Sequence, residues 1–538
     1  MKRAAAVVLA AACAFGASAS SAQTARRPYT MPHVLRYATG EDIVGLNPHL
    51  NSQLTLQLMS TLTMAWLVRY DHANLPVPEL ATAVPSKANG GISADGKTIT
   101  YRLRRGATWS DGAPFTSADV VFSVGVVLNP ANNETTHQGF DRIARVDAPD
   151  PYTVVFRLKQ PYSGFYVNFF SPGGGSPCIL PKHLLAGRTT INDAPYNALP
   201  VGIGPFKYVS WKRADRVEMV ADPNYFGRKP KLQRVIFTII PDRNTALTQL
   251  ETHEIDLWAL VPAAFFDRVH ALPGVATLRQ PSYGYNHIDV EMDHGALRDP
   301  VVRRALRLAI DRREIVDTIR HGIGVLQETP FPPGHPLHVD LPRVPFDVDA
   351  ANRMLDAAGW RRGPDGIRAK RGDRLDFTFA IGTGLPDTDQ ILELIRPTWQ
   401  AIGARFDVKR YPSPLFFAPA QTGGIIYGGK FDLTMYAWYP PPNGDLANLF
   451  ESDRVPPKGQ NVPRFRDAAA DRAMYAFDAT YDLAQQRATS RALQERLVDA
   501  VPTIVLDVRE DVYAYNADLR GFHPNQVTPF DGLVDADI

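Results

Sequence analysis

Alternating apolar and polar residues predict strands at several places in this chain. Ile99, Tyr101 and Leu103 alternate with polar residues, which is the two-residue period of a half-buried strand. At 235–240 the apolar run is continuous instead, as in a strand that is buried on both faces. The other expected strands are shorter or less regular: 33–37, 153–158, 283–290, 431–438 and 503–507.

Helices are predicted where apolar residues recur at helical spacing behind a capping residue. Thr116 with Asp119 three residues later forms a capping box, so a helix is expected to begin there. Residues 53–67 carry large apolar side chains every four positions: Leu54, Leu58, Leu62 and Trp66. We expect Trp66 and Met59 to pack in the core rather than face a ligand. Further helices are expected at 181–185, 242–251, 347–359 and 467–500.

One predicted helix carries many arginines. Asp299 as N-cap and Pro300 at the first position begin it, and Gly322 ends it. Acidic residues are interleaved with the arginines, which favours a solvated face over a nucleic-acid-binding stripe. The arginines concerned are Arg303, Arg304, Arg307, Arg312 and Arg313.

A formal phosphate-loop pattern occurs at 91–98. Gly91, Gly96, Lys97 and Thr98 satisfy G-x-x-x-x-G-K-[ST]. A phosphate loop needs a strand before it and a helix after it, whereas here a strand follows and none precedes. The sequence therefore predicts a glycine-rich hairpin turn at 91–98.

Composition and the N-terminus indicate a secreted globular protein. With 538 residues, 45% hydrophobic and 21% charged, the chain is long enough for two to four domains. A basic start, an apolar run over 4–15 and Ser20-Ser21-Ala22 predict a signal peptide at 1–22 and a periplasmic location. The leucine before Cys13 is one residue too distant for a lipoprotein signal, so lipid anchoring is not expected. Cleavage leaves Cys178 alone, which excludes an intramolecular disulfide.

Charge and motifs exclude several functional classes. Removing Lys2 and Arg3 lowers the basic count from 58 to 56, equal to the 56 acidic residues, which argues against a nucleic-acid partner. Position 257 is leucine where a zinc-protease motif beginning at His253 requires a second histidine. A G-x-S-x-G elbow and a Cys-His pair are absent from the sequence. We therefore expect a binding protein, not an enzyme, without cofactor or metal.

The stretch 98–124 resembles the signature of family 5 extracellular solute-binding proteins, the dipeptide- and oligopeptide-type receptors of ABC importers. The matching residues are Leu103-Arg104-Arg105-Gly106, Trp109-Ser110-Asp111-Gly112, Pro114-Phe115 and Ala118-Asp119-Val120-Val121-Phe122-Ser123. Later segments follow the family's order, and the resemblance extends over roughly 34 to 530.

This resemblance implies an α/β fold of the periplasmic binding protein-like class II (cluster C), with two lobes built from three domains and joined by hinge strands. The implied boundaries are 33–75, 200–284 and 506–538 for a discontinuous domain I, 76–199 for domain II and 285–505 for domain III. The implied function is capture of a short peptide by hinge closure and delivery to ABC permease subunits, by a monomer. A non-peptide solute such as an opine, a sugar or a metal chelate is the alternative, and a secreted hydrolase is a more remote one.

The resemblance also suggests where the ligand binds. In related receptors an aspartate shortly after a tryptophan holds the peptide's ammonium group. Trp438 matches that tryptophan, but prolines stand where the aspartate is expected, and Asp445 is the nearest acid. Alternatively, the face that carries Tyr436 and Trp438 packs inside domain III, as large apolar side chains usually do. The candidate ligand-binding residues are Trp438, Tyr436, Tyr439, Asp445, Tyr285, Asn286, Asn443 and Glu41.

Overall fold

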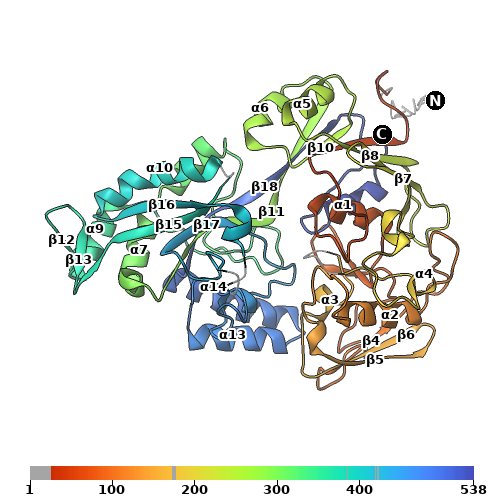
Figure 1. Cartoon of the computed structure of the whole chain (residues 1–538), viewed down its shortest axis with the longest axis horizontal. Helices are drawn as coiled ribbons and strands as arrows, with labels where there is room; N and C mark the ends of the chain where they lie inside the picture. The colour runs from red at the N-terminus through yellow and green to blue at the C-terminus, as the bar shows by residue number, and fades with distance from the viewer. Residues whose placement is uncertain (1–25, 173–176, 384–385, 419, 421–422) are drawn as a thin grey trace, which may run out of the picture.

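The computed structural model describes residues 26–172, 177–383, 386–418, 420 and 423–538. The predicted signal peptide and Cys13 lie outside these residues. Two masses are visible, joined by the long strands β11 (Val275–Val290) and β18 (Thr503–Asn516) (Figure 1). We call residues 26–274 with 517–538 the large lobe, and residues 291–502 the small lobe. This confirms the α/β, two-lobed fold, whereas the exact domain boundaries remain a prediction.

A ten-stranded sheet runs through both lobes. β11 and β18 pair with each other in its middle, and their register shifts between Pro281 and Tyr285, where the chain passes from one lobe to the other. The sheet order is β16 (Arg405–Tyr411), β15 (Asp376–Gly382), β17 (Leu433–Trp438), β11, β18, β10 (Leu257–Ala259), β1 (Val34–Thr39), β9 (Arg234–Ile239), β8 (Arg216–Ala221) and β7 (Phe206–Lys212).

The smaller sheets lie at the margins of the two lobes. In the large lobe they are β4 (Thr98–Arg102), β6 (Thr153–Leu158) and β5 (Ile143–Asp150), and the pair β2 (Val68–Tyr70) with β3 (Pro76–Pro78). In the small lobe they are β12 (Arg361–Arg362), β13 (Arg368–Lys370) and β14 (Asp373–Arg374).

Helices cover the sheets of each lobe (Figure 1). The large lobe contains α1 (Leu54–Thr63), α2 (Ser117–Leu128), α3 (Phe165–Asn168), α4 (Lys182–Leu185), α5 (Arg243–Glu251) and α6 (Phe266–His270). The small lobe contains α7 (Pro300–Leu308), α8 (Arg312–Glu314), α9 (Val348–Ala357), α10 (Pro386–Ala401), α11 (Ser413–Phe416), α12 (Ala447–Phe450), α13 (Ala468–Ala479) and α14 (Leu483–Ala500).

Each lobe has its own apolar core. The large-lobe core joins the strands around Leu35 to the segment that contains Trp109 and Phe156. The small-lobe core surrounds Trp399 and Phe379. Met59 and Trp66 are buried in the large-lobe core, as the sequence predicted. Because the two main cores are separate, β11 and β18 connect two units that can move relative to each other.

The hairpin expected at 91–98 is confirmed. The amide of Ser93 donates to the carbonyl of Thr98 at 2.9 Å, and the amide of Gly96 donates to the carbonyl of Ser93 at 2.9 Å. β4 begins at Thr98, directly after this turn. The segment is a β-turn, without the helix N-terminus that a phosphate loop requires.

The prediction of a single helix from Asp299 to Gly322 is wrong. The chain forms α7, breaks at Ala309, and continues as α8 and a π-helical turn, Ile315–Ile319. Asp311 caps the second segment by accepting from the amide of Glu314 at 3.0 Å. The region predicted as largely helical at 467–500 is likewise two helices, α13 and α14.

The prediction that the arginines form a solvated face is also wrong for Arg303 and Arg312. The side chain of Arg303 is buried and donates to the carbonyls of Ala500 at 2.9 Å and Leu297 at 2.7 Å. Arg312 is buried too and pairs with Glu328. Both arginines hold segments of the small lobe together, because buried guanidinium groups need carbonyl or carboxylate partners.

Candidate functional site

Strands β11 and β17 bring several candidate side chains onto one face of the sheet. They pair antiparallel, with Tyr285 opposite Trp438 and His287 opposite Tyr436. Residues directly opposite in such a pair project from the same face. The ring centroids of His287 and Tyr436 are 4.4 Å apart, and those of Tyr436 and Trp438 are 6.2 Å apart. Tyr285, Tyr436 and Trp438 therefore share one face of the sheet, which the spacing predicted for Tyr436 and Trp438.

Tyr436 is held inside the small lobe by a polar cluster. Its hydroxyl donates to Asp289 Oδ2 at 2.6 Å, and His287 Nε2 lies 3.3 Å from the same oxygen. Only 7% of Tyr436 is exposed, and the ring of Phe416 packs nearby. Burial and the neighbouring Asp289 carboxylate raise the pKa of Tyr436 well above its usual value. Tyr436 thus supports the face, while Trp438 is half-buried at its edge.

Tyr439 directly follows β17, and its ring packs against Gly284 of β11, one of the two strands that join the lobes. Its side chain is 55% exposed, and a Cβ added at Gly284 would be 2.6 Å from the ring. Arg509 Nη1 donates to the Tyr439 hydroxyl at 2.7 Å. Burial raises the pKa of the nearby Asp511 to about 6, although Arg509 opposes the shift. An arginine and a tyrosine hydroxyl are therefore presented together where the lobes meet.

Asn286 and Glu41 have local partners of their own. Asn286 projects from the opposite face of β11, and its Nδ2 donates to Asp507 Oδ1 at 2.7 Å. Glu41 is exposed, and its Oε2 accepts from the amide of Thr55 at 3.1 Å, at the start of α1. The structure does not bring either side chain into the Tyr436 and Trp438 group.

The loop after Trp438 places Asn443 and Asp445 between the lobes. The Oδ1 of Asn443 accepts from the amide of Asp445 at 3.2 Å, and the Oδ1 of Asp445 accepts from the amide of Ala447 at 2.9 Å. Burial raises the pKa of Asp445, whereas the charges of Arg142 and Arg454 act to lower it. Asp445 therefore orders the start of α12 with one oxygen.

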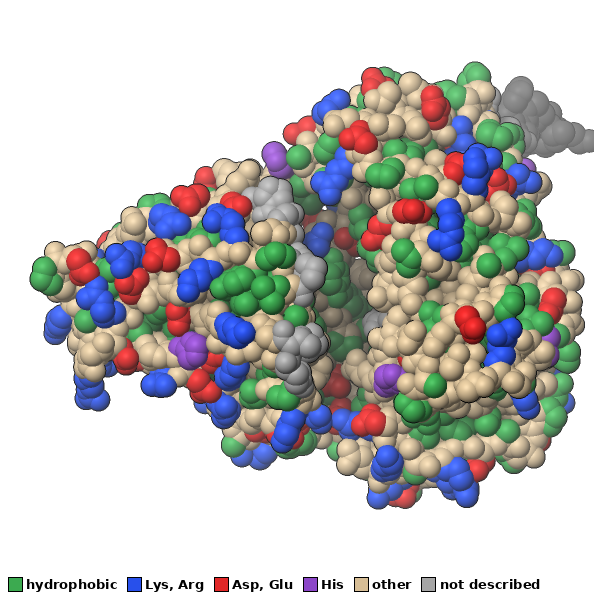
Figure 2. Space-filling view, in the orientation of Figure 1, with side chains coloured by type: hydrophobic (Ala, Val, Ile, Leu, Met, Phe, Trp, Pro, Cys, Tyr) green, Lys and Arg blue, Asp and Glu red, His purple; other side chains and the backbone are tan. Residues whose placement is uncertain are grey.

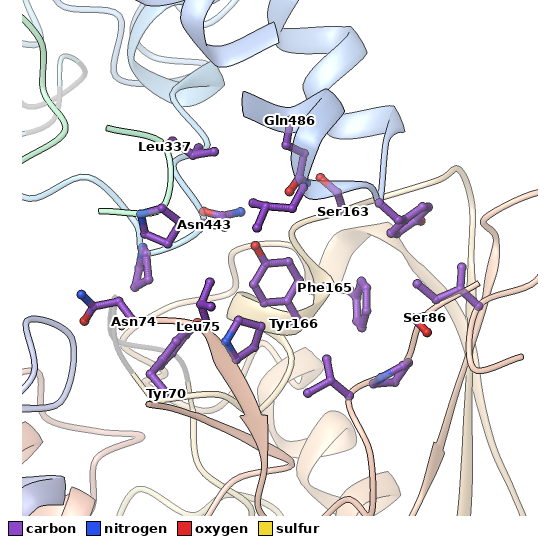
Figure 3. Close-up of a pocket in the computed structure, with 18 residues that line it drawn as sticks. Tyr70, Asn74, Leu75, Ser86, Ser163, Phe165, Tyr166, Leu337, Asn443 and Gln486 are labelled. Carbon is purple, nitrogen blue, oxygen red and sulfur yellow. The ribbon is translucent and has the colours of Figure 1, made fainter. Parts of the chain in front are cut away.

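A pocket of about 240 Å³ lies between the lobes, beside Asn443. Figure 2 shows a deep groove separating the two masses, and Figure 3 shows the pocket residues converging from both sides. The large lobe contributes Tyr70, Phe165 and Tyr166, and the small lobe contributes Leu337, Asn443 and Gln486. The pocket exists only because the lobes face each other, so a bound group there would be held by both.

Direct contacts join the rims of the lobes next to this pocket. The Tyr481 hydroxyl donates to the carbonyl of Gly96 at 2.7 Å and accepts from the amide of Tyr162 at 2.9 Å. Arg142 Nη1 lies 3.5 Å from Asp478 Oδ2. Burial and the nearby Asp445 raise the pKa of Asp478 to about 7, although Arg142 opposes the shift. The rim thus carries a titratable contact.

Sequence reasoning missed most of the pocket. Of the predicted residues only Asn443 lines it, whereas Tyr70, Tyr166 and Tyr481 were not singled out. No local motif marks these tyrosines, because their role depends on three segments that are far apart in the chain. Arg509 was missed as well, since it follows the expected strand 503–507, which in fact continues to Asn516.

Neither a metal centre nor a membrane span is found in the part of the chain that the structure describes. Its histidine, cysteine and acidic side chains form no group of three able to hold a metal ion. No helix among the described residues is both long and apolar enough to cross a bilayer.

Two lobes joined by paired strands, with a pocket between them, define a solute-binding protein of the two-lobed α/β class. The family model for bacterial extracellular solute-binding proteins, family 5, matches residues 76–456. The chain belongs to this family.

Similar proteins agree with this assignment. Protein XP55 of Streptomyces lividans is 34% identical over 309 residues, covering 57% of this chain and 54% of that one. The oligopeptide-binding protein AppA of Bacillus subtilis is 27% identical over 448 residues, covering 81% and 80%. The structure of AppA in complex with a nonapeptide has a TM-score of 0.74 at 22% identity, covering 94% and 98%. That of Campylobacter jejuni NikZ with Ni(L-His) has a TM-score of 0.75 at 25% identity, covering 95% and 100%.

Proposed function

We propose that the chain is the extracytoplasmic receptor of an ABC importer and captures a short peptide between its lobes. The observation that carries this proposal is the pocket lined by residues of both lobes, with Asn443 of the predicted site among them. Closure excludes water and strengthens each hydrogen bond to the guest. AppA, a relative over most of this chain, is an oligopeptide-binding protein, which supports a peptide as the ligand.

In this proposal residues 1–22 are a cleaved signal peptide, the mature protein is a periplasmic monomer without a lipid anchor at Cys13, and it delivers its ligand to the permease subunits of the importer. The domain boundaries are those expected from the sequence. In this proposal the protein binds its ligand without catalysis or cofactor, since the sequence supplies no nucleophile motif.

A non-peptide solute is the second candidate. Prolines follow Trp438 where related peptide receptors carry an aspartate, and Arg509 with Tyr439 presents a cation near this place. A guanidinium favours a carboxylate or another anion rather than an ammonium group. NikZ, which has a similar fold, binds Ni(L-His). An opine or a metal chelate would suit such a site.

A thermal-shift screen of peptides, opines, sugars and metal chelates tests the proposal, because a ligand that binds only the native state raises its melting temperature. Peptides are expected to give the largest shifts. Trp438→Ala and Asp445→Ala are each expected to abolish the shift without unfolding the protein. Shifts from opines or chelates alone would select the second candidate, and full shifts in both variants would place the ligand elsewhere.

A further inference from the structure

The pocket between the lobes has an uncharged lining. Apolar and aromatic side chains dominate it, among them Leu75, Ile92, Phe165, Leu337 and Leu483. None of the described residues that line it is charged. Burying a charged group there would leave that charge without a partner, at a large cost in free energy. The chemistry of the pocket therefore selects an uncharged occupant.

Two polar atoms in the lining lack a hydrogen-bond partner among the described residues, the hydroxyl of Tyr70 and the Nδ2 of Asn443. Asn443 is only 5% exposed, and its Nδ2 has no hydrogen-bond partner among the described residues. The Oδ1 of the same amide is engaged by the backbone of Asp445, which leaves the nitrogen to face the pocket. Figure 3 shows this side chain between Leu337 and Tyr166. A buried donor without a partner is costly, so it indicates an acceptor that arrives with a ligand.

The size of the pocket limits what it can hold. At about 240 Å³ it is smaller than the roughly 300–1,000 Å³ that a complete small-molecule ligand needs. It is several times larger than the roughly 30 Å³ of one water molecule. A single large side chain of a longer guest fits between these limits.

We propose that this pocket is a specificity subsite for one uncharged, apolar side chain of the captured peptide, of leucine or phenylalanine size. Asn443 Nδ2 donates to a carbonyl oxygen of the peptide beside that side chain. Because the lining comes from both lobes, filling the pocket also stabilises the closed arrangement. This inference rests on the proposed capture of a peptide and adds the side-chain preference.

The test is titration calorimetry with five synthetic peptides, Ala-Ala-Xaa-Ala-Ala, where Xaa is Ala, Leu, Phe, Asp or Lys. The Leu and Phe peptides are expected to bind at least about tenfold more tightly than the Ala peptide, because a large apolar side chain leaves water. The Asp and Lys peptides are expected to bind no better than the Ala peptide.

Two variants locate the preference. Leu483→Trp fills the pocket from a position that is 36% exposed, so the change does not depend on repacking a core. It is expected to abolish the preference for Leu and Phe. Leu184→Trp, at an exposed position in α4 outside the pocket lining, is the matched control and keeps the preference. Asn443→Asp keeps the oxygen that Asp445 uses and removes the donor, so it weakens binding of every peptide.

The outcomes separate the two proposals. If the native protein binds the peptides without preferring Leu or Phe, or if Leu483→Trp keeps that preference, the subsite is wrong while peptide capture stands. If the native protein binds none of the five peptides, capture of short peptides is wrong, and the side-chain subsite is rejected with it.

Discussion

At the scale of single residues, His49 shows how a buried charge is held in the large lobe. The side chains of His49 and Glu134 are both fully buried, and His49 Nδ1 lies 3.0 Å from Glu134 Oε1. His49 Nε2 lies 2.8 Å from the carbonyl oxygen of Cys178. Burial alone lowers the pKa of His49, but the Glu134 carboxylate and the hydrogen bonds outweigh it, so the pKa is raised well above its usual value.

Replacing this histidine is expected to destabilise the protein. His49→Gln leaves Glu134 as an unpaired buried charge, at a cost of about 3–5 kcal/mol in the free energy of unfolding. Because the folded-state pKa of His49 is raised, its contribution is fully present below the unfolded pKa of about 6.5 and is lost as pH rises through the folded value. Urea unfolding at pH 6 and pH 9 measures the free energy of unfolding of the native protein and of His49→Gln. The gap between the two values is expected to be smaller at pH 9 than at pH 6. The exposed His72→Gln is the control, and an equal loss in both variants would contradict the account.

The shared face of Tyr436 and Trp438 could be predicted from residues, because alternation along a strand fixes which side chains share a face. The position of Tyr285 opposite Trp438 could not, because it depends on the pairing of β17 with β11. The burial of the Tyr436 side chain could not be predicted in this way. It depends on Asp289 and His287 of another strand and on Phe416, none of which is near in sequence.

At the scale of elements, the loop 201–206 returns the chain to the large-lobe sheet across the end of α1. Gly202 passes so close that an added Cβ would lie 1.9 Å from the carbonyl oxygen of Thr63. Gly204 lies almost as close to the same turn, with the carbonyl oxygen of Leu62 2.5 Å from its added Cβ. The contact is with backbone atoms at the end of a helix, which cannot move aside as a side chain can.

Gly202→Ala is therefore expected to lower the free energy of unfolding by at least about 1–3 kcal/mol, the usual cost of overpacking. Denaturant unfolding measures it. Gly125→Ala is the matched control: Gly125 lies inside α2 with nothing within 4 Å of an added Cβ. That change is expected to stabilise the protein by about 0.5–1 kcal/mol. If Gly202→Ala leaves the free energy of unfolding unchanged, the loop is not tightly packed against α1.

Strands and caps were predictable where the signal is local. β4 and α2 begin where alternation and the Thr116 capping box place them. The break in the helix after Asp299 was not predicted, although Asp311 is a good N-cap, because the apolar spacing continues through it. The full length of β18 was missed because charged residues interrupt its pattern at 509–511, where the strand crosses between the lobes.

At the scale of the whole molecule, the rim contact is expected to make closure depend on pH. Burial and the nearby Asp445 raise the pKa of Asp478 to about 7, and Glu451 raises it further. Arg142 and Arg454 act in the opposite direction. If the lobes separate and Asp478 is hydrated, its pKa falls toward about 3.9. The closed arrangement then binds a proton more tightly, so it is favoured as pH falls from 8 to 5.

Small-angle X-ray scattering of the ligand-free protein tests this dependence. The radius of gyration is expected to be smaller at pH 5 than at pH 8, and Asp478→Asn removes the difference. Asp193→Asn, at an exposed aspartate of the large lobe, is the control and keeps it. A larger radius at pH 5, or a pH effect that persists in Asp478→Asn, would contradict the role of this carboxyl.

The overall architecture was predictable because the 98–124 signature and the order of later segments identify the family. The pocket was not, since its walls come from segments between Tyr70 and Gln486 that meet only when the lobes approach.

Native mass spectrometry of the protein incubated with a defined mixture of short peptides tests the central claim most directly. The account predicts a one-to-one complex with a peptide that survives desalting, and a peptide released on denaturation with its mass unchanged. A released ligand of altered mass, or no retained peptide at any concentration tried, would contradict capture without chemical change.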